Sequence, residues 1–330
     1  RVLNHMLASG YWYVQQMFSK VYASEKLPFT LKKEQYNNGV NNYIPIYEHP
    51  SLAGKYTELK ELIGFVALDD DRSKVAMGAG QKINYFPSRK IRLTVDAKKC
   101  VENGIVPREM ADQIVPYIEW EIKQNALFKN DLALLDFLAT NNWERSLYTA
   151  NPSSLSSFLD IDQYLHQEGV VYKFMPVKAD NYYEGIGGVN PDKTYEVFMN
   201  CRWGNLNDPH VTVDRESDRN SRMPRQNYLR AAETFINRGE KQKAVELLDK
   251  CQYFFPDSKI QYDMMLIPFA EIYYQAEEKD KANAILLRLT EIYGDDLRYF
   301  NGLKAGFAEK YYSSEVERTV RLLRTISQLA

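Results

Sequence analysis

The last hundred residues repeat a spacing of small and aromatic side chains that restricts them to pairs of packed helices. Counted from Arg225, the recurring residues fall at positions 4, 8, 11, 15, 20, 24 and 32, and they are Tyr228, Ala232, Phe235, Gly239, Ala244, Leu248 and Pro256. The two alanines lie where two neighbouring helices would touch, the glycine suits the turn between them, and the proline ends the pair.

The same spacing returns further along the chain. A second pass, counted from Asp263, contains Leu266, Ala270, Tyr273, Ala282 and Leu286 at the matching positions. A third and weaker pass contains Ala308 and Val320, twelve residues apart like the first alanine pair. The offset from Ala232 to Ala270 is 38 residues, about four more than the ~34 of a tetratricopeptide repeat. The pattern therefore predicts an all-α tetratricopeptide-like helical repeat domain.

The first two hundred residues have a different pattern, in which strands and helices alternate. A strand at 145–150, a helix at 158–167 and a strand at 170–177 are joined by a connection long enough for a parallel βαβ unit. A polar segment at 200–224 separates the two patterns. We therefore expect an α/β domain with parallel βαβ elements and helical insertions over residues 1–215, followed by the helical repeats over 216–330.

Apolar spacing predicts the other elements of the first domain. The expected strands lie at 2–7, 82–87 and 90–97, and the last two are candidates for a hairpin. The expected helices lie at 11–28, at 57–66 with Thr57 as the cap, at 114–122 and at 132–138.

Composition argues against several classes of protein. The chain has 42 basic and 44 acidic residues and a net charge of −2, which does not favour nucleic acid as a partner. Its three cysteines and four histidines lack metal-site spacing. No apolar run approaches the ~18 residues that span a bilayer, and the opening residues do not have the pattern expected of a signal peptide. A strand at the very first residues indicates a piece cut from a longer protein.

Other clusters of glycine and aspartate favour structural interpretations. Gly185, Gly187 and Gly188 do not lie between a strand and a helix, so a structural turn is preferred to a phosphate loop. The run 69–71 of three aspartates is interpreted as a solvated helix end, and the acidic residues of 208–218 alternate with arginines. Neither group has calcium-loop spacing. No catalytic, metal or cofactor-binding residue is predicted.

Five residues are candidates for ligand contact. Tyr11 and Trp12 follow the first expected strand, and Asn151 and Ser153 follow the strand at 145–150. Ligands of α/β sheets gather beyond the carboxyl ends of strands. Trp143 precedes its strand, at the opposite edge. It lies in "LATNNWERSLYTA", which is interpreted as a helix end, an Asn-Asn stop suited to left-handed backbone and a strand, with Trp143 plugging the corner.

Three segments together resemble one family. "VLNHMLASGYWYVQQM", "LDFLATNNWERSLYTA" and "YLHQEGVVYKFMPV" followed by "GGVN" are similar to the carboxy-terminal soluble region of a polytopic membrane protein family common in Bacteroidota. That family is grouped as glycosyltransferase family 117, and its eukaryotic relatives are protein O-mannosyltransferases. The resemblance implies that the catalytic acid lies in a loop among transmembrane helices that this chain lacks, so no catalytic residue is carried over.

The resemblance leads to one functional expectation and two alternatives. We expect the extracytoplasmic, non-catalytic soluble part of a membrane-bound glycosyltransferase-like protein at the periplasmic face of the inner membrane. Its repeats would position an acceptor polypeptide or partner protein, with a glycan as a further candidate ligand, and a missing amino-terminal region would supply the membrane anchor. The first alternative is a cell-envelope scaffold that binds proteins through its repeats. The second is a soluble α/β enzyme that uses the crevice near Tyr11.

Overall fold

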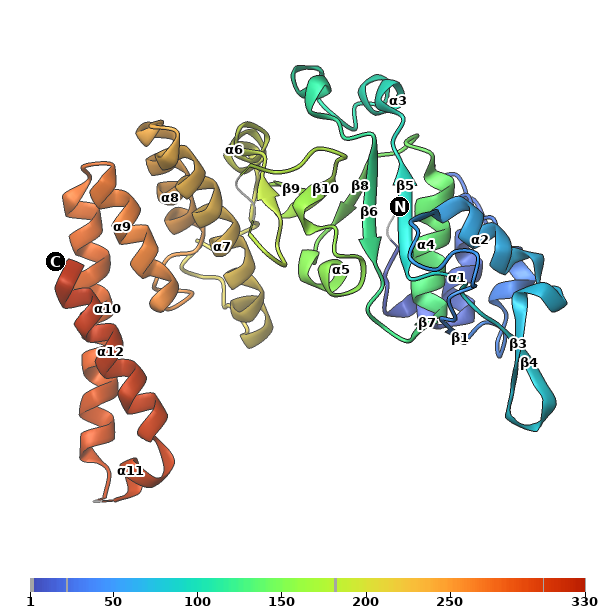
Figure 1. Cartoon of the computed structure of the whole chain (residues 1–330). Helices are drawn as coiled ribbons and strands as arrows, with labels where there is room; N and C mark the ends of the chain where they lie inside the picture. Colours follow the sequence, from blue (N-terminus) through green and yellow to red (C-terminus); the bar gives the residue numbers. More distant parts are fainter. Residues whose placement is uncertain (1–2, 22, 181–182, 305, 330) are drawn as a thin grey trace. The chain divides into compact units, whose positions relative to one another are not determined.

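The computed structural model describes residues 3–21, 23–180, 183–304 and 306–329 (Figure 1). The chain forms two compact units. Unit 1 contains residues 1–166 and 172–188, and unit 2 contains residues 167–171 and 189–330. In the described residues, no helix is both long and apolar enough to cross a membrane.

Three small sheets belong to unit 1. The first pairs β1 (Tyr43–Pro45) with β7 (Ala126–Phe128) in antiparallel fashion, and the second is the hairpin of β3 (Lys74–Met77) and β4 (Gln81–Asn84). The third has the order β2–β5–β6, and its strands are β2 (Thr57–Glu58), β5 (Lys90–Thr94) and β6 (Tyr117–Glu121). β2 and β5 are parallel, and α2 (Leu59–Leu68) lies in the connection between them. A parallel βαβ element is therefore present, as predicted, although at a different place in the chain.

The predicted βαβ unit at 145–177 is wrong in its details. β8 (Leu147–Thr149) and β10 (Val171–Phe174) are both strands, but they pair antiparallel. The helix between them, α5 (Pro152–Leu159), ends early, and residues expected to continue it form the strand β9 (Leu165–Glu168). The sheet order is β11–β9–β10–β8, with β11 at Gly188–Val189. Because β9 supplies an additional strand, the chain can reverse through a short turn at Gly169, where φ is +75°.

The core of unit 1 surrounds two helices. The first is α2, and the second is α4 (Lys129–Asn141), whose apolar face includes the buried Leu132, Leu135 and Leu138. Asp131 fixes the start of α4, because its carboxylate accepts a hydrogen bond from the backbone N–H of Phe128 at 2.9 Å. Figure 1 shows α4 beside α2 and the strands. Unit 1 also contains α5, α1 (Tyr11–Met17) and α3 (Ala97–Glu102).

The predicted helix at 114–122 is a strand. Ile118, Trp120 and Ile122 are buried, while the side chains between them are more exposed, so the true period is two. Isoleucines four residues apart satisfy a period of 2 as well as one of 3.6, which explains the error.

Several smaller predictions also change. Thr57 does not cap α2; it belongs to β2, and Glu58 precedes the helix. β4 and β5 are strands near the expected positions, but each pairs with other strands, so they do not form a hairpin. The strand expected at 2–7 does not form over residues 3–7, which the structure describes. Leu7–Ser9 is a 3₁₀ turn. Val2 lies outside the described residues.

Unit 2 consists mainly of helices. They are α6 (Pro191–Asn200), α7 (Arg215–Asn237), α8 (Lys241–Phe254), α9 (Ile267–Gln275), α10 (Lys279–Gly302), α11 (Phe307–Tyr311) and α12 (Ser313–Leu329). α7 packs on α8, and α9 packs on α10, as the repeat spacing predicts. All four key alanines are fully buried: Ala232, Ala244, Ala270 and Ala282. Gly239 turns the first pair with φ +78°, and Glu277 adopts φ +70° at the corresponding turn of the second pair.

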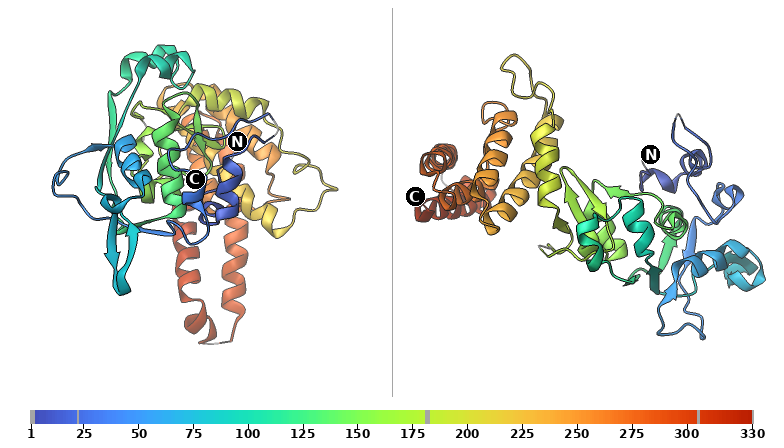
Figure 2. Two further views of the ribbon diagram at one scale, coloured as in Figure 1. Left: turned by 90° about the vertical axis from the view of Figure 1, so that its right-hand side faces the viewer. Right: turned by 90° about the horizontal axis from the view of Figure 1, so that it is seen from above.

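The third repeat has an unusual form. Ala308 lies in the five-residue helix α11, which is too short for a repeat helix, and Val320 lies in α12. α12 instead packs along the long helix α10, and Figures 1 and 2 show the two helices side by side.

The division into units falls at 188/189, whereas the sequence places a boundary at 215. The physical reason is α6, which packs on α7 and α8. Its Phe198 is fully buried, and its ring stacks on Tyr228 of α7 with centroids 3.8 Å apart. The repeats were expected to begin at Glu216, which is the second residue of α7 and not the first residue of the unit.

Candidate functional site

A cavity of about 540 Å³ surrounds the end of α4 in unit 1. It is formed by the end of β5 with the start of α3, by the end of α4 with the turn after it, and by single residues of β2, α2, β8 and β10. Among its lining residues are Thr94, Asp96, Asn141, Trp143 and Phe174. One of the five predicted ligand-contact residues, Trp143, is thus part of its wall.

Trp143 is held firmly in this wall. Its indole N–H donates to the carbonyl of Thr94 at 2.9 Å, and its ring stacks on Phe174 with centroids 5.8 Å apart. The side chain is only 6% exposed. Asn142 and Trp143 both have left-handed backbone, with φ of +47° and +57°. The helix therefore ends where the sequence predicts. The indole of Trp143 fills the corner after α4, and little of its surface is exposed to a ligand.

The mouth of the cavity carries charges of both signs. Lys60 and Arg145 are exposed and have no hydrogen-bond or ion-pair partner for their side chains within the described ranges. Glu58 accepts from the Thr94 hydroxyl at 2.6 Å, and Asp96 caps α3 through the Lys99 N–H at 3.0 Å. Such a mixed rim can hold a polar ligand that itself carries charges.

Tyr11 lies at a second, smaller cavity of about 240 Å³ in unit 1. Trp12 adjoins it, because its indole lies over Gly10, a residue of the cavity lining. The expectation that Tyr11 follows a strand is wrong, since a 3₁₀ turn precedes α1. Tyr11 nevertheless lies beside a cavity. That Tyr11 contacts a ligand there stays a prediction.

Asn151 and Ser153 lie elsewhere. Both are exposed at the start of α5, and neither lines the two cavities described above. The amide oxygen of Asn151 accepts from the Ser154 N–H at 3.2 Å, which is the geometry of a helix cap. The structure therefore does not bring Asn151 and Ser153 together with Tyr11 and Trp12 at one cavity.

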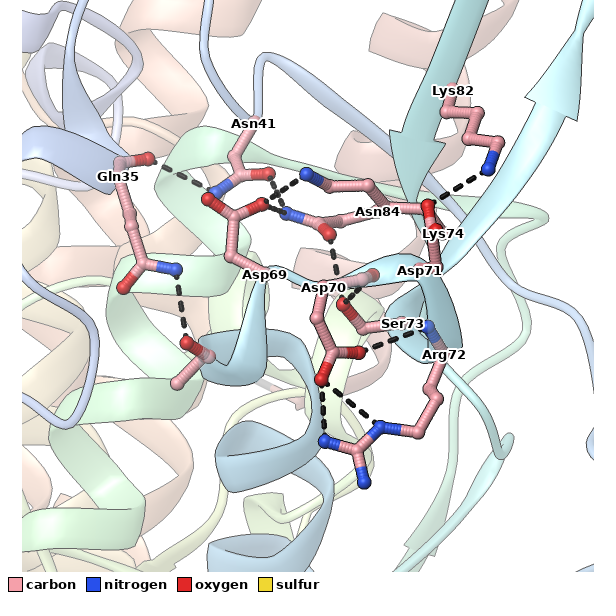
Figure 3. A network of polar contacts seen from close by, with 11 residues as sticks. Gln35, Asn41, Asp69, Asp70, Asp71, Arg72, Ser73, Lys74, Lys82 and Asn84 are labelled. Carbon is pink, nitrogen blue, oxygen red and sulfur yellow. Dashed lines mark hydrogen bonds and ion pairs between the residues drawn. The ribbon is translucent and has the colours of Figure 1, made fainter.

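The three consecutive aspartates at 69–71 do not form a cation site. Each has a basic partner, and Figure 3 shows the pairs Asp69–Lys74, Asp70–Arg72 and Asp71–Lys82. Hydrogen bonds from these partners lower the pKa of Asp70 and of Asp71 below the usual value. α2 ends immediately before Asp69, which has φ +53°. The predicted helix end is therefore correct.

A buried amide ties this helix end to the rest of unit 1. Asn84 donates to the side-chain oxygens of Asn41 at 2.9 Å and Asp69 at 3.1 Å, and it accepts from the Ser73 hydroxyl at 3.2 Å (Figure 3). All polar atoms of the Asn84 side chain thus have partners inside the protein.

The glycine segment is a structural turn, as expected. Gly187 has φ +95°, and a Cβ atom there would lie 2.6 Å from the carbonyl oxygen of Leu165. The turn is further fixed by the N–H of Gly185, which donates to the Asp162 carboxylate at 2.6 Å. Glycine is required at 187 because both the left-handed backbone and the close approach exclude a side chain.

The described part of the chain contains no cluster of metal ligands, and two of its three cysteines are buried. No group of three or more His, Cys, Asp or Glu side chains there is arranged to hold a metal ion. Burial raises the pKa of Cys100 and of Cys251 to about 12, which keeps both thiols protonated at neutral pH.

A buried carboxyl group lies on α4 in unit 1. Asp136 on α4 is fully buried, and burial raises its pKa to about 6, although hydrogen bonds from Thr30 and Leu31 oppose the shift. It lines neither cavity of unit 1. The sequence contained a signal for this residue, because an aspartate among the apolar positions of a predicted helix must find internal partners.

Unit 2 has a polar cavity of about 400 Å³. It lies between the start of α7, which contributes Arg215, Asp218 and Arg222, and the loop from α8 to α9, which contributes Lys259 and Asp263. Arg222 and Asp263 form an ion pair at 3.6 Å, and Lys259 donates to the carbonyl of Val211 at 2.6 Å. Arg215 and Asp218 form no side-chain hydrogen bond or ion pair with other described residues. The two groups remain available to a partner.

Residues 1–193 match the family model described as TMEM260-associated domain 2. No curated protein and no solved structure matched the chain. The match covers all the segments on which the sequence resemblance rests. Because it includes more than half of the chain, the protein belongs to the TMEM260-associated domain 2 family.

Proposed function

We propose that this chain is the extracytoplasmic, non-catalytic part of a membrane-bound glycosyltransferase-like protein and that it positions an acceptor polypeptide or a partner protein. In this proposal the sugar transfer takes place in a membrane region outside the chain, at the periplasmic face of the inner membrane. The family supports it, because TMEM260-associated domain 2 is linked to membrane proteins that are similar to protein O-mannosyltransferases.

The observation that carries the proposal is the polar cavity of unit 2. It lies between α7 and the loop that joins the first helix pair to the second. It presents the guanidinium of Arg215 and the carboxylate of Asp218, neither of which has a side-chain hydrogen bond or ion pair with a described residue. A polypeptide can satisfy both groups at once with side chains of opposite charge. Helix-repeat units commonly offer extended binding surfaces of this kind.

Weak binding at this cavity is sufficient for the proposed role. A tethered binding site raises the local concentration of acceptor into the ~mM range, so that each transfer begins from a captured chain. Loss of the cavity is therefore expected to raise KM for a protein acceptor and to leave kcat unchanged, because the residues that perform the transfer are elsewhere.

The test uses the full-length membrane protein. Reversing both charges with Arg215→Glu and Asp218→Lys is expected to raise KM for protein acceptors several-fold. KM for a short peptide that carries only the acceptor hydroxyl should stay unchanged, because such a peptide does not reach the cavity. Arg298→Glu on α10 is the matched control, because this exposed side chain lies outside the cavity. If removal of residues 216–330 leaves glycosylation by the full-length protein unchanged, the proposal is wrong.

The alternative function is a cell-envelope scaffold without a role in sugar transfer. A cluster of aromatic side chains at the junction of α10, α11 and α12 favours it. The cluster contains Tyr299, Phe300, Phe307, Tyr311 and Tyr312. Tyr299 is 60% exposed and Tyr311 is 57% exposed, and exposed aromatics are enriched at protein interfaces. Unchanged glycosylation together with loss of a bound envelope protein in Tyr299→Ala and Tyr311→Ala variants would favour the scaffold.

A further inference from the structure

The cavity beside Tyr11 combines exposed aromatic rings with side-chain amides. Four segments of unit 1 meet there: Ser9 and Gly10, the start of α1, the loop 37–42 before β1, and the junction of β7 with α4. Figure 1 shows α1, α4, β1 and β7 in one part of unit 1. Its amides are those of Asn38, Asn42 and Asn130.

The aromatic rings at this cavity are unusually accessible. Tyr11 is 43% exposed and Phe128 is 54% exposed, and both line the cavity. Tyr43 is 45% exposed and packs against Phe128 with ring centroids 6.0 Å apart. Trp12, beside Gly10, is 52% exposed. Large aromatic side chains normally bury most of their surface, so this group offers flat apolar faces to a ligand.

The cavity offers almost no ionic group. Lys129 is its one charged lining residue. That side chain is only 2% exposed, and its ammonium donates to the carbonyls of Tyr36 at 3.2 Å and Asn37 at 2.6 Å. The charge is therefore already occupied inside the protein. An anionic ligand such as a phosphate would find no free cation in this lining.

The amides, by contrast, have hydrogen-bonding capacity left. Asn38 and Asn42 are exposed, and neither side chain makes a hydrogen bond with the described residues. The amide nitrogen of Asn130 lies 3.0 Å from Nε2 of His5, and its amide oxygen accepts no hydrogen bond from the described residues. Each amide can donate to one hydroxyl and accept from another.

From these observations we infer that the Tyr11 cavity is a binding site for a neutral saccharide. The apolar C–H face of a sugar ring would lie on Tyr11 or Phe128, and its hydroxyls would exchange hydrogen bonds with the asparagines. A volume of about 240 Å³ is below the ~300–1,000 Å³ of pockets for drug-sized ligands, which suits one sugar ring of a longer glycan. The inference goes beyond acceptor positioning by unit 2, because it concerns a different site and a different ligand.

The experiment measures saccharide binding to the 330-residue chain by saturation-transfer NMR and calorimetry. The probes are methyl α-mannoside, methyl β-glucoside and their linear trisaccharides, with glucose 6-phosphate as the anionic comparison. We expect binding of at least one neutral trisaccharide. Tyr11→Ala and Phe128→Ala are each expected to weaken it about 3- to 10-fold, which corresponds to the loss of one aromatic contact.

The control is Tyr117→Ala on β6, because Tyr117 is 44% exposed, almost the same as Tyr11, but lies outside this cavity. Its Kd should equal that of the unchanged chain, and circular dichroism should show that all variants are folded. The inference fails if no neutral saccharide binds, if Tyr11→Ala and Phe128→Ala leave Kd unchanged, or if the site prefers glucose 6-phosphate. None of these outcomes depends on glycosylation, so failure here is separate from failure of the proposed function.

Discussion

The hydroxyl of Tyr36 donates a hydrogen bond to the carboxylate of Asp136 at 2.9 Å, and both side chains are fully buried. The same carboxylate accepts from the backbone N–H groups of Thr30 at 2.7 Å and Leu31 at 3.1 Å. One acid of α4 therefore holds a loop that lies about a hundred residues earlier in the chain. This loop continues into the segment that carries the amides of the Tyr11 cavity.

The stability of unit 1 should depend on the ionisation of Asp136. Burial raises its pKa from 3.8 to about 6. Because the folded-state pKa is above the unfolded value, the contribution of this group is full below pH 3.8 and is lost as the pH rises through 6. The difference in unfolding free energy between the unchanged chain and Asp136→Asn should decrease by about 2 kcal/mol from pH 4 to pH 7.

Urea unfolding at several pH values, followed by tryptophan fluorescence, measures this difference. Glu144→Gln in the turn after α4 is the control, since Glu144 is exposed and its substitution should not change the pH dependence. A difference that increases with pH would mean that the hydrogen bonds outweigh burial and that the pKa of Asp136 is lowered.

In unit 2, Arg225 is a structural cation without an ion pair among the described residues. It is 2% exposed, and its guanidinium donates to the carbonyls of Phe255 at 2.8 Å and Ile260 at 2.6 Å. Arg225→Met would leave these buried carbonyls unpaired, at a cost of about 2–4 kcal/mol. Arg222→Met, one turn earlier on α7, removes an exposed ion pair worth about 1 kcal/mol or less. Thermal unfolding should rank the two variants in this order, and equal effects would contradict the structural role.

The left-handed end of α4 gives a test of backbone strain. Asn142 has φ +47°, and its side chain is exposed. Glycine adopts this conformation without strain and alanine does not. Asn142→Ala should therefore destabilise unit 1 by about 1 kcal/mol, whereas Asn142→Gly should be neutral or stabilise it by a few tenths. Denaturant midpoints of the two variants measure the effect. If alanine and glycine give the same midpoint, the left-handed conformation is not present in solution.

The success of sequence reasoning differed between the two units for a physical reason. In unit 2 the helix pairs contact each other through residues close in sequence, so the alanine spacing of Ala232 and Ala244 was enough to predict them. In unit 1 the paired strands are far apart in the sequence, and no local pattern of residues predicts which strands pair. The apolar runs of β8 and β10 predict strands, but their antiparallel pairing depends on β9, whose residues also fit the spacing of a helix end.

The candidate sites show the same limit. The segment "TNNW" predicts the left-handed backbone of Asn142 beside Trp143. The cavity that Trp143 lines also depends on Thr94 and Phe174, which come from strands distant in the sequence. Tyr11 is a candidate because of its place after an expected strand that is absent from the described residues 3–7, and the cavity beside it depends on the loop 37–42 and on Phe128. Sequence reasoning thus found aromatic residues near cavities but not the amides that accompany them.

The last prediction concerns α6, which decides where unit 2 begins. Phe198 is fully buried and stacks on Tyr228 of α7, so Phe198→Ala should destabilise unit 2 by about 3–5 kcal/mol. Hydrogen exchange of backbone amides should therefore become faster in α7 and α8 and stay unchanged in α2 and α4. Phe65→Ala in α2 is the reciprocal control, because its ring packs on Tyr85 inside unit 1. If Phe198→Ala instead accelerates exchange in α2 and α4 and not in α7, α6 belongs to unit 1 and the boundary at 215 is correct.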